Sequence, residues 1–149
     1  MTLAHLLPRW ALHRSMLILV VAFAGFIASG AASAGKSSSV GATCSGGGQL
    51  CNNIATFPRT ILVPGGVGEG QFTPGPLTCS DVRIHFLIDG TEVAVSGFVG
   101  PGATTDFVSL GFIGPGEHVV GVQAEGEVGG CNAGTLLSWA GTVKLRKAP

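Results

Sequence analysis

The sequence predicts an all-β fold: a single antiparallel β-sandwich of about seven strands after an N-terminal signal or anchor helix. Short apolar segments alternate with polar residues at a period of two, and glycine-proline turns separate them. After the first 34 residues, no segment repeats apolar residues at helical spacing. Four cysteines in a small chain with a leader-like start favour a cross-linked, exported domain.

Residues 1–34 have the layout of a secretory signal peptide. Arg9 and Arg14 precede an apolar segment, residues 16–34, whose last three residues are the Ala-Ser-Ala of a cleavage site. The segment could instead be retained as a membrane anchor, because it is long enough to cross the hydrocarbon core. The domain is therefore expected to be secreted, periplasmic or on the cell surface, or else anchored with the domain outside.

The segment after the leader is rich in serine and glycine. Residues 35–53 are therefore predicted to be a flexible tether with a local disulfide, and residues 54–149 to form the sandwich. Two short strands are expected first, at residues 60–63 and, more weakly, at residues 71–73.

The clearest strand covers residues 82–88, where apolar residues occupy one face and Arg83 and His85 the other. Asp89-Gly90 then predicts a tight hairpin into a strand whose Val93 and Val95 point inward. Further strands are expected at residues 108–112, 120–124 and 137–145. In the last of them, Trp139 is expected to fill the space between the sheets.

Four cysteines in an exported domain predict two disulfides, and three pairings are possible. We favour Cys44–Cys51 as a local link and Cys79–Cys131 as a long one. A zinc site is disfavoured because no two of these cysteines have C-x-x-C spacing.

Three segments carry a resemblance to a known class of domain: VRIHFLIDG from Val82, PGEHVVGV from Pro115 and WAGTVKL from Trp139. In layout, residues 57–147 resemble the immunoglobulin-like and fibronectin-III-like domains of exported bacterial proteins. This resemblance implies a sandwich without shared catalytic residues. The chain has no tyrosine, so it lacks the tyrosine corner of antibody-type domains.

Charge and residue content exclude several classes of function. After residue 34 the chain carries six Lys or Arg and eight Asp or Glu, a net charge of −2. This balance argues against nucleic-acid binding, which needs a basic face. Only two histidines follow the leader, and both methionines precede its end, so no metal site and no cofactor are expected.

The two histidines are the candidates for catalysis. His85 is expected to be exposed on a sheet face, and His118 to form a hydrogen bond in the turn after Pro115-Gly116. An exported hydrolase would use one of them as a general base.

Candidate binding residues are two outward phenylalanines and the polar residues of a glycine-rich loop, residues 126–134, with its flanking strand. They are Phe98, Phe107, Glu125, Glu127 and Asn132. The leading hypothesis is an exported, non-catalytic module that binds or scaffolds at the cell envelope or outside the cell, its partner an unknown protein or envelope component. A small secreted inhibitor or effector that binds through this loop is the third hypothesis, beside the hydrolase.

Overall fold

The computed structural model describes residues 35–57, 61–63 and 65–149, and this part of the chain contains strands and no helix. The predicted signal or anchor helix lies outside it. The strands are β1 (Lys36–Thr43), β2 (Ala55–Thr56), β3 (Ile61–Val63), β4 (Gly66–Pro74), β5 (Val82–Ile88), β6 (Thr91–Val95), β7 (Val108–Ile113), β8 (Gly116–His118), β9 (Val120–Gly126) and β10 (Ser138–Lys147). The all-β prediction is confirmed. Among the described residues, no helix is long and apolar enough to span a membrane.

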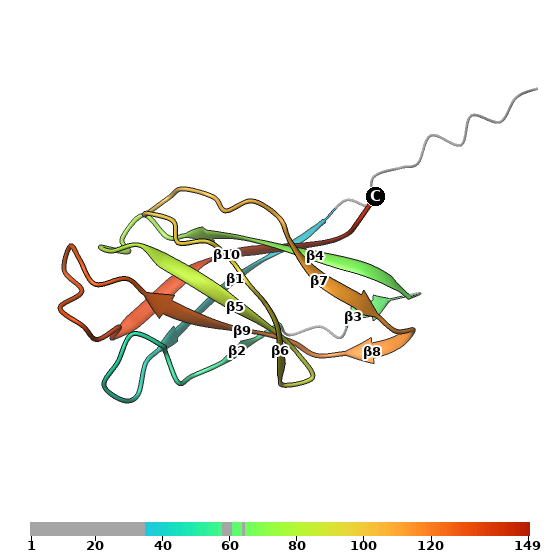
Figure 1. Ribbon diagram of the computed structural model, residues 1–149, viewed down its shortest axis with the longest axis horizontal. Coiled ribbons are helices and arrows are strands. Elements are labelled where there is room, and N and C mark those ends of the chain that lie inside the picture. The colour runs from blue at the N-terminus through green and yellow to red at the C-terminus, as the bar shows by residue number, and fades with distance from the viewer. Residues whose placement is uncertain (1–34, 58–60, 64) are drawn as a thin grey trace, which may run out of the picture.

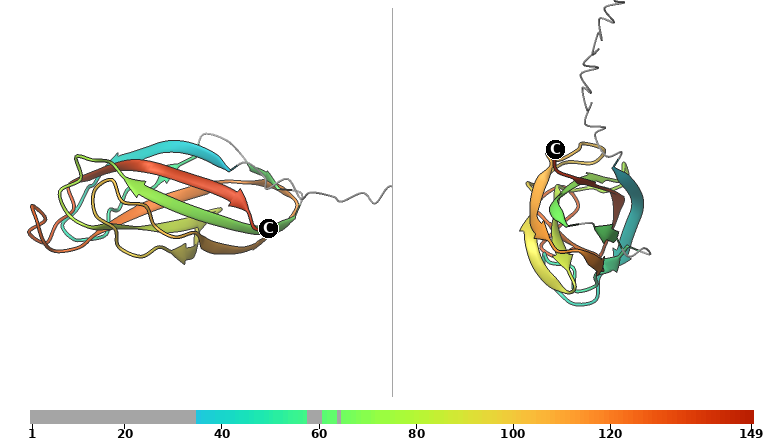
Figure 2. Two further views of the ribbon diagram at one scale, coloured as in Figure 1. Left: turned by 90° about the horizontal axis from the view of Figure 1, so that it is seen from above. Right: turned by 90° about the vertical axis from the view of Figure 1, so that its right-hand side faces the viewer.

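Two four-stranded antiparallel sheets make up most of the fold (Figure 1). The first sheet has the order β1-β10-β4-β7, and the second has the order β2-β9-β5-β6. A separate two-stranded sheet pairs β3 with β8. Seen along the long axis, the strands surround a common interior (Figure 2).

Both sheets contribute to one hydrophobic core. The first sheet supplies Phe72, Leu110, Trp139, Val143 and Leu145, and the second supplies Val82, Ile84, Phe86, Val120 and Val122. Trp139 is buried, as predicted, and its ring meets Phe72 edge-on at a centroid distance of 6.1 Å. This shared core is what a two-layer β-architecture requires.

The hairpin between β5 and β6 forms where the sequence predicts it. Asp89 and Gly90 both have positive φ, 51° and 82°, which is the geometry of a type I′ turn. The expectation that Val93 and Val95 point inward is wrong: Val95 lies opposite His85, on the outer face. Phe86 pairs with Ala94 and Leu87 with Glu92, so Val93 is an extra residue in a bulge, and Ala94 faces the core instead.

The predicted tether is also wrong. Residues 36–43 form β1, which pairs with β10 along its whole length, from Lys36 opposite Leu145 to Thr43 opposite Ser138. Val40 and Ala42 pack against the core from this strand. The strand count is higher than the expected seven because β1, β2 and β8 were not foreseen.

Glycines in the strands make room for aromatic rings from the facing sheet or the neighbouring strand. A Cβ on Gly70 of β4 would lie 2.6 Å from Cε1 of Phe86, and one on Gly141 of β10 would lie 2.5 Å from Cε2 of Phe72. Because carbon atoms pack at about 3.5–4 Å, a side chain at either site would displace a ring. These glycines therefore set how closely the core can pack.

We expect Gly70→Ala to lower the free energy of unfolding by about 1–3 kcal/mol, because the added methyl group overpacks the core against Phe86. Gly114→Ala is the matched control: it has open space around the added atom and should change stability by less than about 0.5 kcal/mol. Urea denaturation of both variants measures the difference. Equal stabilities of the two variants would show that the packing of the Phe86 ring does not require a glycine at position 70.

Candidate functional site

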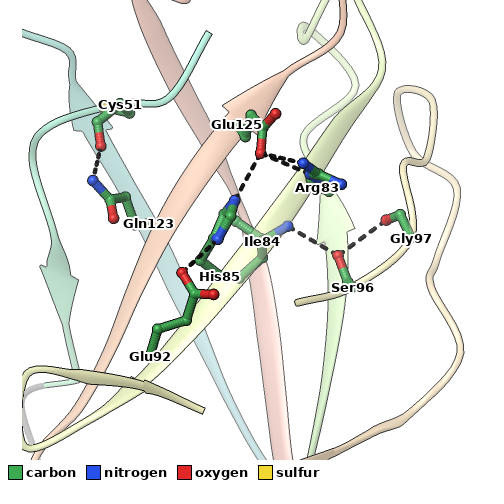
Figure 3. Close-up of polar contacts among 9 residues, drawn as sticks. All are labelled: Cys51, Arg83, Ile84, His85, Glu92, Ser96, Gly97, Gln123 and Glu125. Atoms are coloured by element: carbon green, nitrogen blue, oxygen red, sulfur yellow. Dashed lines mark hydrogen bonds and ion pairs between the residues drawn. The ribbon is translucent and has the colours of Figure 1, made fainter. Parts of the chain in front are cut away.

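His85 lies between two carboxylates on the outer face of the second sheet (Figure 3). Its Nδ1 is 2.8 Å from Oε2 of Glu92 on β6, and its Nε2 is 2.8 Å from Oε2 of Glu125 on β9. The residue is only 8% exposed. The expectation of an exposed histidine is therefore wrong, because the two strands that flank β5 place long side chains over the ring.

Arg83 extends this cluster along β5. Its Nε donates a hydrogen bond of 2.7 Å to Oε2 of Glu125, and its Nη2 lies 2.7 Å from the same oxygen. The guanidinium group also lies over the ring of Phe98, 4.6 Å from its centroid. Phe98 points outward as predicted, but Arg83 covers it, and Oε2 of Glu125 is shared by Arg83 and His85.

The environment of Glu125 favours its charged form. Partial burial is the largest influence and by itself would raise the pKa. The hydrogen bonds from His85 and Arg83 and the charge of Arg83 together outweigh it, so the pKa of Glu125 lies below its ordinary value of 4.5. Glu125 is therefore an anion that holds the cluster together at neutral pH.

The hydrogen bonds of the cluster engage both ring nitrogens of His85. Both ring nitrogens of His85 face carboxylate oxygens, so neither is free to accept a proton from a substrate. The ring makes no contact with a hydroxyl or thiol among the hydrogen bonds of the described residues. We therefore find no nucleophile and base paired at His85.

His118 forms a hydrogen bond, but its partner is Asp89 in the turn between β5 and β6 and not a group in its own turn, as was expected. Its Nδ1 is 2.7 Å from Oδ2 of Asp89, and the backbone N–H of Val119 donates to Oδ1 of Asp89 at 2.9 Å. The hydrogen bond from His118, followed by that from Val119, holds the pKa of the Asp89 carboxyl below its usual value. These contacts fix the hairpin turn against the link between β8 and β9.

The outer face of the first sheet carries a similar arrangement. Arg146 lies over the ring of Phe107 at 3.5 Å from its centroid, and its Nε donates a 2.6 Å hydrogen bond to Oε2 of Glu69. Lys144 lies 5.7 Å from the same ring. Phe107 points outward as predicted, and it too is covered by a cation rather than free for a partner.

Four connecting segments come together at one end of the molecule, at the left of Figure 1. They are residues 44–50, 75–81, 99–104 and 127–137. Backbone hydrogen bonds join the last of these segments to the first two: Leu136 N–H donates to Gly48 O at 2.9 Å and Glu127 N–H to Asp81 O at 2.8 Å. We call these four segments the loop end.

Both disulfides brace the loop end. Cys44 is bonded to Cys51 and Cys79 to Cys131, with Cα–Cα distances of 4.9 and 5.6 Å, which confirms the favoured pairing. The first closes one of the segments, and the second joins the β4–β5 segment to the β9–β10 segment. Among the described residues no cysteine is free. Two disulfides indicate an oxidising environment, outside the cell or in a periplasm.

The polar residues predicted for the loop separate into two groups. Glu127 is exposed, with its N–H donating to Asp81 O. Asn132 is buried, and the prediction that it forms a binding surface is wrong. Its Nδ2 donates to Oε1 of Gln49 and to the carbonyl of Glu127, both at 2.9 Å, so its role is to shape the loop.

The most exposed apolar side chains of the loop end were not foreseen from the sequence. Leu77 is 96% exposed, Leu137 71% and Val128 66%. Each stands in or beside a turn-rich segment, where periodicity gives no sign of which way a side chain points. The only available signal is a large apolar residue inside a glycine-proline or glycine-rich segment, as in Gly75-Pro76-Leu77.

The charges at the loop end are all negative. Its four segments contain the exposed carboxylates Asp81 and Glu127 and no Lys or Arg. Within the described residues, no group of three or more histidine, cysteine or acidic side chains is arranged to hold a metal ion. The loop end therefore offers apolar tips among isolated acidic groups.

No protein-family model matches the sequence, and no curated protein or solved structure matches it either.

We expect Glu125→Gln to lower the free energy of unfolding by about 1–2 kcal/mol at pH 7, because it removes the anion that His85 and Arg83 share. A carboxyl with a lowered pKa contributes its stability above the ordinary value of 4.5 and loses it as the pH falls further. The difference between parent and variant should therefore shrink below pH 4.5.

Thermal unfolding of both proteins from pH 7 to pH 3 measures this dependence. Glu127→Gln removes the same charge from an exposed side chain without a hydrogen bond among the described residues, and should leave the pH profile unchanged. If Glu125→Gln matched Glu127→Gln at every pH, the cluster would contribute nothing to stability.

Proposed function

We propose that this chain is an exported, non-catalytic binding module, secreted or held at the cell envelope, that takes a protein partner at the loop end. The observation that carries the proposal is the exposure of Leu77, Val128 and Leu137 on segments that two disulfides hold in place. A braced loop loses little conformational freedom on binding, so its apolar contacts are converted more fully into affinity.

The position of the loop end supports the same function. β1 begins and β10 ends at the opposite end of the molecule, since Lys36 pairs with Leu145 and Lys147 with Gly68 (Figure 1). A leader or anchor joined to β1 would thus leave the loop end pointing away from its attachment. This is the geometry of a domain that displays its loops.

The charges of the loop end indicate the chemistry of the partner. Asp81 and Glu127 lie in segments that hold no basic residue. Complementary potentials steer association and disfavour like-charged partners. We therefore propose a partner whose surface combines apolar residues with Lys or Arg, rather than an anionic lipid or polysaccharide.

An immunoglobulin-like architecture remains part of the proposal. The β5–β6 hairpin with β9 on its other side, facing a sheet that contains β4 and β7, supports it. The last strand departs from the usual order: β10 lies in the opposite sheet from β9, between β1 and β4, whereas antibody-type domains keep their last two strands together.

Substitution of the exposed leucines tests the proposed binding end. A photo-reactive residue at position 77 in the exporting cell should cross-link the partner, and Leu77→Ser and Leu137→Ser together should then weaken its binding at least about tenfold. Stability should not change, because both side chains are exposed. Calorimetric titration with the purified partner gives the affinity.

Phe112→Ser is the control, because Phe112 is 74% exposed but lies at the opposite end, on β7. Loss of binding in this variant, with none in the leucine variants, would place the site elsewhere. If a panel of substrates instead revealed turnover that His118→Ala abolished without loss of stability, the chain would be an enzyme and the proposal would fail.

A further inference from the structure

Strand β1 differs from every other edge strand of the two large sheets. β7 carries a register shift opposite Gly68 and Glu69, β6 contains the bulge at Val93, and β2 has only two residues. Bulges and short length are the usual protections of a sheet edge against pairing with another chain. β1 has neither protection: it spans eight residues in unbroken register.

The sequence of β1 adds no protection of another kind. It contains no proline, and its one charged residue, Lys36, stands at its start. The residues that follow on the outer face are small: Ser37, Ser39 and Gly41. A second strand could therefore approach this edge without meeting a bulky or charged side chain.

The direction of the backbone groups follows from the register with β10. Cys44 donates its N–H to Leu137 O at 2.8 Å, one residue beyond the pair of Thr43 and Ser138. Because hydrogen-bonded positions alternate in an antiparallel pair, the odd-numbered residues of β1 point their N–H and C=O groups away from β10. The side chain of Asn53 donates to Thr43 O, which ends the free edge there.

Three residues are left with outward backbone groups: Ser37, Ser39 and Gly41. Among the described residues, none of their N–H groups has a partner on that side, and Ser39 O receives only a 3.5 Å contact from the hydroxyl of Ser38. A free, regular edge with this spacing is self-complementary, since Ser37 can pair with Gly41 of a second copy.

We propose that two copies of this chain associate through antiparallel pairing of their β1 strands, centred on Ser39. Three residue pairs, each with two hydrogen bonds, would give about six bonds across the two-fold axis. The first sheets of the two copies would then form one continuous sheet. The same surface patch serves both partners, so the assembly closes at a dimer.

The arrangement has a geometric consequence for the loop ends. β1 runs toward the loop end in each copy, because Thr43 pairs with Ser138 there. Antiparallel pairing therefore points the two loop ends in opposite directions.

Hydrogen exchange of the released, exported protein tests the pairing directly. At high concentration the amides of Ser37, Ser39 and Gly41 should be protected at least about tenfold more than after dilution to monomer, and sedimentation equilibrium should show a dimer. The β10-facing amides of Ser38 and Val40 are the internal control, because their protection should not change on dilution. A monomer at all concentrations, with rapid exchange at the three odd-numbered amides, would overturn the proposal.

Two variants separate this edge from other modes of association. Ser39→Pro removes an outward N–H and should weaken dimerisation about tenfold or more, since it removes hydrogen bonds only at the free edge. Ser39→Glu should also weaken it, because the two new charges face each other across the axis. Thr142→Glu adds the same charge one strand further in, opposite Ser39 on β10, and should have a much smaller effect. Equal effects of both glutamates would place the contact elsewhere.

Discussion

The spacing of the two sheets depends on the contact between the Phe86 ring and the bare backbone of Gly70. The ring crosses from β5 of the second sheet to β4 of the first, and it fits only because Gly70 has no side chain. Because side chains alternate between the two faces of a strand, the inward position of Phe86 places Arg83 and His85 on the outer face of β5. The polar cluster on the outer face thus follows from a contact inside the core.

Short stretches of the sequence predicted the structural features that depend mainly on neighbouring residues. The alternation over residues 82–88 and the Asp89-Gly90 turn yielded β5, its inward row and its hairpin, and the spacing of the cysteines favoured the pairing that forms. The burial of His85 could not be read in this way, because Glu92 and Glu125 reach it only after β6 and β9 have paired with β5. β1 was missed for the same reason: a serine-rich segment becomes a strand when β10 gives it a partner.

The two outer faces are satisfied within the molecule. On each of them an arginine lies over a phenylalanine and pairs with a glutamate: Arg83 with Phe98 and Glu125, and Arg146 with Phe107 and Glu69. Cation, ring and carboxylate cover one another at these two positions, whereas Phe112 on β7 of the first sheet remains 74% exposed. Within the described part of the chain, exposed apolar side chains also gather at the loop end, and the β1 edge carries backbone donors and acceptors without partners.

The place of β10 has a consequence for how the chain reaches its folded form. This last strand lies inside the first sheet, between β1 and β4, so its neighbours come from the beginning and middle of the chain. Lys36 and Leu145, paired across β1 and β10, are separated by almost the whole domain. Topologies dominated by such distant pairings fold slowly, and this sheet cannot close until β10 has been synthesised. For the export proposed above, a first sheet that closes only when β10 is complete would favour passage through a membrane as an unfolded polypeptide, followed by folding and disulfide formation on the far side.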